Sequence, residues 1–487
     1  MSQGNLKKNY VYQLLYQFVR YGTPIFTTPY IARVLGSEGV GIYSFTASIL
    51  AYFSMFAALG TSIYGARTIA QCRDDIDRMT KSFWEIEILT IFTSCISIVA
   101  WIVWSSISNN FQLYFFALTP HLFANMFNIV WFYKGLEKVG YVVRRDVFFK
   151  ILGIVYLFLF VKTKEDLFSY MFVNALISLM GSLSMWIYLP KILTKINIRT
   201  LSFGHHLKET IVYFIPTIAV SIYTILDKTL IGIITQDVRQ NGYYEQANKI
   251  IKMVKSTVII SVNSVITVRS SYLFAGGNNA KVKQMIEHSL NYILFLSVGA
   301  VFGLCGIAKN FVPFFLGDGY DSVITLLCFM APLIILVAIS NTMGAQYYTP
   351  SGKRRESTKY IIYGSCVNLM ANLLLIPRFG TVGAVIATLI AESIISFLYV
   401  RNSCGYMSFR KLFGFMWKKI LAGGVILAII VTIRLHWSGN PIVLLIVQII
   451  TGISVYGVLL LLFKDTIAHE IWHVLVKFVK RVRFKLR

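Results

Sequence analysis

The stretch NPIVLLIVQIITGISVYGVLLLLF, residues 440–463, contains no charged side chain. About 20 apolar residues in a helix cross the hydrocarbon core of a bilayer, so this stretch predicts a transmembrane helix. Similar apolar runs recur between clusters of charged residues along the chain. Together they predict about fourteen transmembrane helices, at residues 11–32, 40–66, 82–106, 111–133, 141–161, 167–189, 210–234, 242–266, 289–316, 322–347, 359–377, 381–400, 417–434 and 440–463.

The composition also indicates an all-α membrane protein. Of the 487 residues, 56% are hydrophobic and only 14% are charged, whereas about 25% of the residues in soluble domains are charged. A soluble protein of this size has no interior that would hold so many apolar side chains, so lipid must solvate them. The loops between the predicted helices are short and offer no room for catalytic groups. We therefore expect a transporter and not an enzyme.

The distribution of basic residues predicts the orientation of the chain. The formal net charge is +25, but the basic residues lie in short loops between apolar runs, which does not favour a nucleic-acid partner. Lys and Arg concentrate in alternate loops, whereas loop 105–112 has no charge and loop 317–322 is acidic. This positive-inside pattern predicts that both termini are cytoplasmic. The tail at 464–487 alternates apolar and basic residues, which predicts an amphipathic helix on the inner membrane surface.

Several charged residues fall inside the predicted spans, and most of them are cationic. A charge in a span is costly unless it faces a cavity or a partner. Arg20 lies well inside the first span, and three lysines lie on one side of the eighth. Because buried cations favour a mobile anion, this group predicts a binding site for a phosphate-bearing substrate. The predicted substrate-binding residues are Arg20, Lys150, Asp227, Lys228, Lys249, Lys252 and Lys255.

Structural roles compete with this interpretation. The lysines of the eighth span can also extend along the helix to reach the membrane interface. Asp227 and Lys228 can form an ion pair that only fixes helix packing. Glu392, in the twelfth predicted span, is a candidate for binding a proton or a sodium ion that drives transport.

One motif near the C-terminus is typical of an enzyme. His469-Glu470-Ile471-Trp472-His473 has the HExxH spacing of zinc proteases, which places two histidines on one helical face. No third ligand lies nearby in the sequence, and basic residues occupy the other side of the helix, as in a surface anchor. The six cysteines show no pair at metal or redox spacing. We therefore predict neither a metal site nor a cofactor.

Four segments resemble the Wzx-type oligosaccharide flippases of the multidrug/oligosaccharidyl-lipid/polysaccharide exporter superfamily. The matching segments are TTPYIARVLGSEGVGIYSF (27–45), NIVWFYKGLE (128–137), LDKTLIG with GYYEQANKI (226–232 and 242–250) and NLLLIPRFGTVGAVIATLIAE (372–392). The segments contain Asp227, Lys228 and Lys249 of the predicted site. Asn128 departs from the family, in which an acidic residue often precedes the Trp-Phe pair, and this leaves the ion coupling of this chain open.

The resemblance implies a fold and a substrate. The expected fold has two six-helix lobes, at 1–200 and 201–405, two additional helices at 406–463 and the basic tail at 464–487. The expected function is translocation of an undecaprenyl-pyrophosphate-linked oligosaccharide repeat unit across the cytoplasmic membrane of a bacterium, for a capsule or an O-antigen. Other membrane proteins of polysaccharide assembly are expected partners. The alternatives are a cation-coupled drug or metabolite exporter of the same superfamily and a membrane glycan polymerase or ligase.

Overall fold

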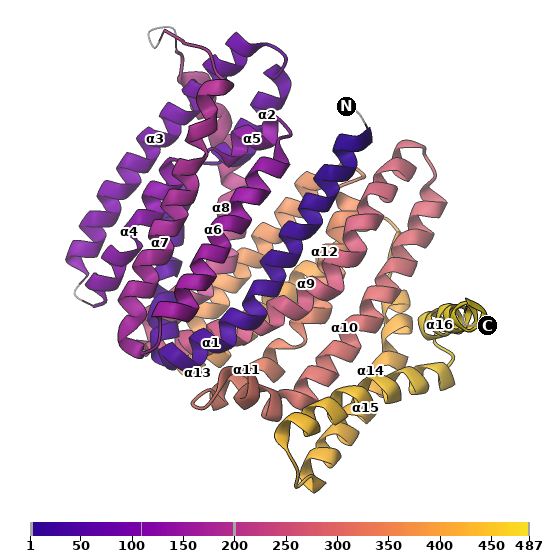
Figure 1. The fold of residues 1–487 in the computed structure, drawn as a ribbon. Coiled ribbons are helices and arrows are strands. Elements are labelled where there is room, and N and C mark those ends of the chain that lie inside the picture. Colours follow the sequence, from indigo (N-terminus) through magenta and orange to yellow (C-terminus); the bar gives the residue numbers. More distant parts are fainter. Residues whose placement is uncertain (1–2, 109, 198–200, 486–487) are drawn as a thin grey trace. The chain divides into compact units, whose positions relative to one another are not determined.

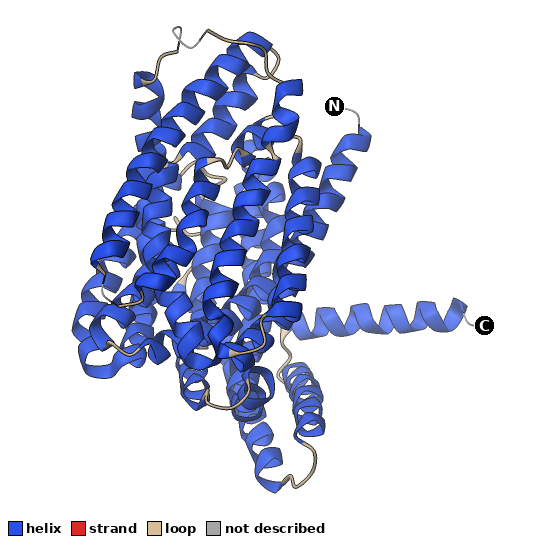
Figure 2. Cartoon of the chain, turned by 60° about the vertical axis from the view of Figure 1, so that its left-hand side comes forward, coloured by secondary structure: helices blue, strands red, loops and turns tan. Residues whose placement is uncertain are grey.

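The chain is helical throughout the part that the structure describes. The computed structural model describes the backbone of residues 3–108, 110–197 and 201–485. It describes their side chains except for 3–18, 20–21, 139, 215–217, 219–223, 260–262, 264–265, 268 and 478–485. All the regular elements in these ranges are helices (Figure 2). The predicted all-α fold class is confirmed.

The first of two compact units comprises residues 1–242. Its core lies where α1, α3, α4 and α7 pack together, around buried side chains such as Trp101 and Phe115. Its helices (Figure 1) are α1 (Gln3–Ala58), α2 (Thr61–Cys72), α3 (Ile76–Ile107), α4 (Gln112–Met126), α5 (Val130–Gly135), α6 (Val139–Phe160), η1 (Lys164–Asp166), α7 (Leu167–Ser184), η2 (Trp186–Lys191) and α8 (Gly204–Thr235).

The second unit comprises residues 243–487, so α9 begins in the first unit and continues through the second. Within it, α10 packs against α12, α14 and α15. Its helices are α9 (Val238–Ala275), α10 (Asn279–Leu316), α11 (Asp321–Met330), α12 (Leu333–Met343), η4 (Gly344–Tyr348), α13 (Arg354–Arg401), α14 (Phe409–His436), α15 (Pro441–Leu462) and α16 (Thr466–Lys485). The lobe boundaries implied by the family resemblance stay predictions.

Two of the long helices are broken at a glycine. Gly36 in α1 has φ 67° and ψ 178°, and Gly380 in α13 has φ 54° and ψ −133°. Residues with a Cβ rarely adopt such positive φ values, which explains glycine at both breaks. The breaks separate the first predicted span from the second and the eleventh from the twelfth. Each of these helices therefore accounts for two predicted spans.

Every predicted span coincides with a helix, part of a helix or two or three consecutive helices. Eight helical segments of the described residues are long and apolar enough to cross a membrane, or nine if the bent pair α11–α12 is one span. Two of the eight contain the glycine breaks. α6 is not among them, because Arg144, Arg145, Asp146 and Lys150 interrupt its apolar sequence. A charged helix in this setting is a place to look for a functional site.

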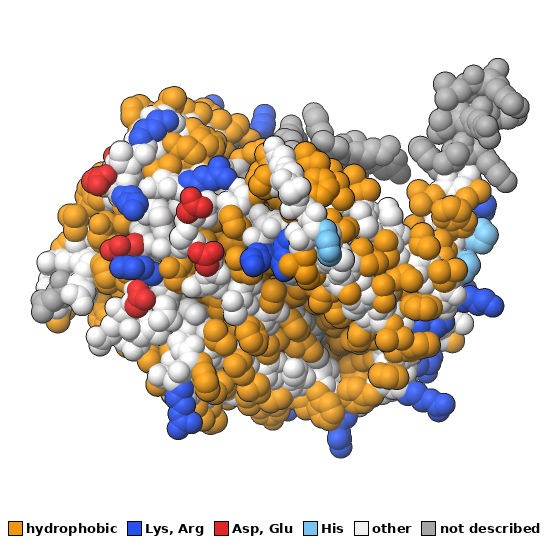
Figure 3. Space-filling model, turned by 90° about the horizontal axis from the view of Figure 1, so that it is seen from below, with side chains coloured by type: hydrophobic (Ala, Val, Ile, Leu, Met, Phe, Trp, Pro, Cys, Tyr) orange, Lys and Arg blue, Asp and Glu red, His pale blue; other side chains and the backbone are white. Residues whose placement is uncertain are grey.

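The exterior of the molecule is apolar, as expected for a surface in contact with lipid. Large side chains such as Phe26, Ile107 and Leu374 are exposed by 70% or more, and hydrophobic side chains cover much of the face in Figure 3. A soluble monomer rarely exposes so much apolar surface. α16 differs, since it contacts α10 and α15 but its C-terminal end projects away from them (Figure 2), and it has apolar and basic residues along its length.

Candidate functional site

A polar cavity of about 440 Å³ lies between α1, α6 and α7 of the first unit. Lys150, one of the predicted site residues, contributes to its wall. We call this space the α1–α6–α7 cavity. Its polar lining residues are Thr23, Thr27, Asn128, Arg145, Asp146, Lys150, Tyr170, Asn174, Ser178 and Ser182.

The two cations of this cavity are held differently. The Lys150 Nζ donates a hydrogen bond to the Val19 carbonyl of α1 at 3.2 Å. Arg145 donates from Nη1 to the Gly181 carbonyl at 2.5 Å and also forms an ion pair with Asp146. Among the described lining residues there are two cations and one carboxylate, a balance that suits an anion. α1 includes position 20, but the Arg20 side chain lies outside the described residues.

The hydroxyl groups of α1 that line the cavity are bonded within their own helix. Thr23 donates to the Val19 carbonyl at 2.6 Å, and Thr27 donates to the Thr23 carbonyl at 3.1 Å. These bonds to the preceding turn let hydroxyl side chains sit in a membrane helix without an unpaired donor. The hydroxyl oxygens remain acceptors, so α1 gives the cavity a polar wall without adding charge.

Asp227 and Lys228 do not line the α1–α6–α7 cavity. They lie on α8, where it packs closely on α1: a Cβ added at Gly232 would lie only 2.1 Å from the Phe45 ring. Asp227 is buried and interacts electrostatically with Tyr52 of α1. Beside it, the Thr229 hydroxyl donates to the Ser48 hydroxyl at 2.9 Å. This setting is compatible with the packing role as well as with a substrate role.

The three predicted lysines of α9 have different surroundings. The Lys249 Nζ lies 3.5 Å from the Glu245 carboxylate one turn earlier in the same helix. Lys252 is exposed, whereas Lys255 is partly buried and interacts electrostatically with the buried Glu392 of α13. The structure thus brings the predicted ion-coupling carboxylate together with one of the predicted substrate lysines, inside the second unit.

Two carboxylates on α3 were missed by the sequence analysis. Glu85 and Glu87 lie in the segment WEIEIL (84–89), inside the third predicted span. The Glu85 carboxylate is hydrogen-bonded to Nε2 of His206 in α8 at 2.8 Å. Glu87 is completely buried, and neither of its carboxylate oxygens has a hydrogen-bond partner among the described residues. Two acidic residues within one apolar span are the sequence feature that could have identified Glu85 and Glu87 as candidates.

The HExxH motif lies on α16. The Glu470 carboxylate is hydrogen-bonded to Nε2 of His288 in α10 at 2.8 Å, and both side chains are more than half exposed. This contact joins α16 to α10 and uses the glutamate that would act as the general base of a zinc protease. The arrangement fits a helix attached to the surface of its unit.

Comparison with known proteins places the chain in a family. Residues 6–268, more than half of the sequence, match the family described as "Polysaccharide biosynthesis protein". The chain belongs to this family. The chain is also similar to a protein of Escherichia coli strain K12 named "Putative O-antigen transporter", which is 26% identical over 82% of this chain and 97% of its own length. A protein of the same name from Shigella dysenteriae is 24% identical over 80% of this chain and 98% of its own length.

The fold is that of known flippases and exporters. The chain is similar to the lipid II flippase MurJ in an inward closed conformation, with a TM-score of 0.75, 16% identity, and coverage of 94% of this chain and 100% of that one. An inward-facing MATE multidrug transporter of the MOP superfamily gives a TM-score of 0.60 and 12% identity over 87% and 98% of the two chains. The predicted family and the prediction of a membrane transporter are confirmed. A membrane polymerase or ligase is therefore no longer an alternative.

Proposed function

We propose that this transporter moves an undecaprenyl-pyrophosphate-linked oligosaccharide repeat unit across the cytoplasmic membrane of a bacterium by alternating access. The cell would use the repeat unit for a capsule or an O-antigen. Such a substrate has a long apolar tail and an anionic head. The names of the two curated relatives support a glycan substrate.

The observation that carries the proposal is an apolar groove of about 820 Å³ in the second unit. It lies between α10, α14, α15 and α16, and we call it the α10–α15 groove. Ile307, Ile430 and Ile453 contribute to its walls. Among the described lining residues, the side chains that carry a polar group are those of Gln448, Ser454, Tyr456 and Trp472. A polyprenyl chain gains free energy from burial in such a groove.

Considered by itself, the α1–α6–α7 cavity of the first unit offers donors that suit a pyrophosphate. A pyrophosphate accepts charge-assisted hydrogen bonds from Lys and Arg, and these bonds are strong where water is scarce. Lys150 and Arg145 provide such donors from the same helix. We retain Arg20, Asp227, Lys228 and the α9 lysines as proposed substrate residues, with Glu392 as the proposed ion-coupling residue.

A filled groove should block transport. No heavy atom lies within 4 Å of a Cβ added at Gly457, which lines the groove. The Gly457→Phe side chain should therefore occupy the groove without disturbing helix packing. If burial of the tail contributes more than about 1.4 kcal/mol to binding, export should fall at least roughly tenfold. Surface polymer in a complemented deletion strain measures export. Gly424→Phe is the matched control, since Gly424 is equally open but lies outside the groove. Equal export by both variants would contradict a role for the groove.

The deletion strain itself tests the proposed substrate. Loss of the transporter should leave lipid-linked oligosaccharide in the inner leaflet, where mass spectrometry of extracted lipids identifies the glycan and its pyrophosphate. The wild-type gene should remove the accumulated lipid, and the Gly457→Phe gene should not. A deletion strain with normal surface polymer and no accumulated lipid would refute the proposal.

Labelling of one cysteine tests the proposed orientation, in which both termini are cytoplasmic. Cys404 is exposed in the loop between α13 and α14, and hydrogen bonds with Tyr347 and Lys353 lower the pKa of its thiol. The thiolate is the reactive form, so labelling should stay fast at neutral pH and slow only as the pH falls through the lowered pKa. An impermeant maleimide should label Cys404 in inverted vesicles but not in intact cells. Cys404→Ser identifies the signal, and labelling in intact cells would reverse the orientation.

A second candidate function is cation-coupled drug export. The buried carboxylates Glu87, Asp227 and Glu392 favour it, since carboxylates bind organic cations and coupling ions. A drug-susceptibility screen of the deletion strain, run beside the lipid analysis, separates the two functions. Increased susceptibility with unchanged lipid-linked oligosaccharide would favour the exporter.

A further inference from the structure

A second polar crevice lies in the first unit, apart from the α1–α6–α7 cavity. It has a volume of about 330 Å³ and is formed by α2, the first turns of α3 and the first turns of α8. We call it the α2–α8 crevice. Its lining includes Arg67, Gln71, Arg78, His205, Glu209 and Tyr213. None of these residues belongs to the predicted substrate site.

In the part of the chain that the structure describes, the two arginines of the crevice have no carboxylate partner. Within the described residues, no Asp or Glu lies within ion-pair distance of Arg67 or Arg78. The side chain of Arg67 donates instead to the neutral Tyr213 hydroxyl. Arg73, between them in sequence, pairs with Glu137 at 2.9 Å. Carboxylates are thus within reach at this end of the unit, but the crevice arginines are not paired with them.

The inner wall of the crevice is a buried chain of hydrogen bonds. His206 interacts through Nε2 with Glu85 at 2.8 Å and through Nδ1 with the Tyr64 hydroxyl at 2.6 Å. The other Glu85 oxygen accepts from the Ser202 backbone N–H at 2.7 Å. Since both oxygens and both ring nitrogens are occupied, these groups hold α3 and α8 in place and leave the arginines free to serve another ligand.

The electrostatics of the crevice favour an anion. Glu209 is its remaining carboxylate, so the two guanidinium groups outnumber it, and His205 adds a donor one turn before it. Guanidinium groups bind phosphate oxygens in a bidentate geometry, as they bind carboxylate oxygens. The crevice also lies where the basic loops of the first unit begin, near Arg73, Arg78 and Lys81, which the charge pattern predicts at the inner surface of the membrane.

We propose that the α2–α8 crevice is a binding site for a phosphate group at the inner membrane surface, with Arg67 and Arg78 as its principal ligands. The phosphate belongs either to a lipid head group or to a free pyrophosphate, and the same donors bind both. The proposal does not depend on which substrate is transported, because the site lies outside the cavity and the groove described above.

The test uses the full-length protein in nanodiscs and two double variants. Arg67→Gln with Arg78→Gln removes both ligands. Lys134→Gln with Arg144→Gln removes the same charge from exposed positions of the same unit. In phosphatidylcholine nanodiscs, calorimetry measures binding of inorganic pyrophosphate. In nanodiscs that also contain phosphatidylglycerol, native mass spectrometry measures the lipid retained by the protein.

The two arms distinguish the source of the phosphate. Pyrophosphate binding that weakens at least roughly tenfold in the arginine variant and not in the control indicates a free anion. Phosphatidylglycerol retention lost in the arginine variant alone indicates a lipid head group. Arg67→Lys with Arg78→Lys, which keeps the charge but loses the bidentate geometry, should give an intermediate loss and guards against misfolding of the first variant. Absence of both ligands from the wild type, or equal losses in the arginine variant and the control, would overturn the proposal.

Discussion

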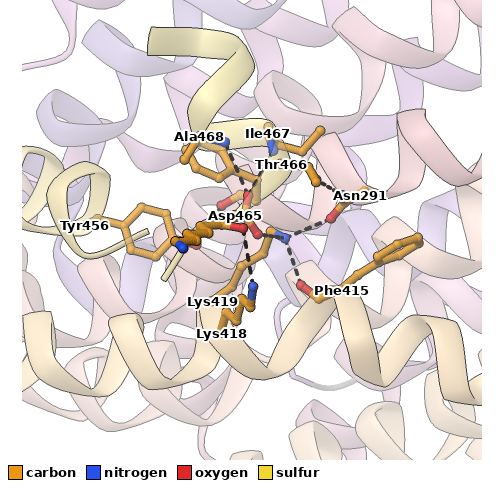
Figure 4. Close-up of polar contacts among 11 residues, drawn as sticks. Asn291, Phe415, Lys418, Lys419, Tyr456, Asp465, Thr466, Ile467 and Ala468 are labelled. Carbon is orange, nitrogen blue, oxygen red and sulfur yellow. Dashed lines mark hydrogen bonds and ion pairs between the residues drawn. The ribbon is translucent and has the colours of Figure 1, made fainter. Parts of the chain in front are cut away.

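Lys419→Met is expected to lower the free energy of unfolding by about 3–5 kcal/mol. Lys419 is completely buried in α14, and its Nζ lies 2.8 Å from the Asp465 carboxylate, the Asn291 side-chain oxygen and the Phe415 carbonyl (Figure 4). Removing the cation leaves a buried carboxylate without its counter-charge, which costs far more than the loss of a surface ion pair. Denaturant titration in detergent micelles measures the change.

Two further variants decide whether the charge or the packing matters. Lys418→Met removes the neighbouring lysine, which donates only to the Lys464 carbonyl at 3.3 Å, and should cost less than about 1 kcal/mol. Asp465 also accepts hydrogen bonds from the Ile467 and Ala468 backbone N–H groups at the start of α16. Lys419→Met with Asp465→Asn keeps an oxygen for these bonds and removes the stranded charge, so it should be more stable than Lys419→Met alone. If the two single lysine variants were equally stable, the buried pair would not matter.

Sequence alone gives no reason to separate Lys418 from Lys419. Both belong to a basic segment that the charge pattern places at the membrane surface, and only the fold shows that one is buried and the other is not. The partner carboxylate, Asp465, lies beyond α15. Hydropathy locates helices, because every residue of a span contributes to it, but a single ion pair depends on which faces of two distant helices meet.

The breaks in α1 and α13 show what sequence can predict well. Each is a glycine between two apolar runs that together exceed one membrane crossing, so length and glycine position indicate the break before any packing is known. The same reasoning explains why the fold was predictable and the pairing of charges was not. Lys249 was expected among substrate cations, but Glu245, one turn earlier, already lies 3.5 Å away.

Glu87 illustrates a different limit. Its place in an apolar span could be read from the sequence, but its burial without a hydrogen-bond partner among the described residues could not. Burying a carboxyl group without such a partner is costly, and only the fold shows that Glu87 is in this position. The prediction that most charges inside the spans are cationic fits the walls of the α1–α6–α7 cavity, where Asp146 is paired with Arg145. It does not fit α3, which contains Glu85 and Glu87.

Lys150→Met is expected to reduce export of surface polymer by roughly ten- to hundredfold, the effect of losing one or two hydrogen bonds to a charged ligand. Lys150 is the predicted site residue that the structure places in the wall of a polar cavity, and its Nζ bonds to a backbone carbonyl of α1. Methionine keeps the length and apolar stem of the side chain and removes the charge together with the hydrogen bond to the Val19 carbonyl. Export in a complemented deletion strain, divided by the amount of folded transporter in the membrane, measures the effect.

The matched control is Lys162→Met, at the end of the same helix. Lys162 is exposed and bonds to the Phe158 carbonyl, outside the α1–α6–α7 cavity. Arg145→Met should behave differently from both, because Arg145 links the Gly181 carbonyl to Asp146, and its loss should lower the amount of folded protein before it affects transport per molecule. A Lys150→Met protein that folds and exports normally would contradict the proposal that the α1–α6–α7 cavity binds the phosphate groups of the substrate. If instead Lys150→Met lowers export per folded transporter and leaves the amount of folded protein unchanged, the positive charge itself binds the substrate, and the effect does not arise from altered packing of α6.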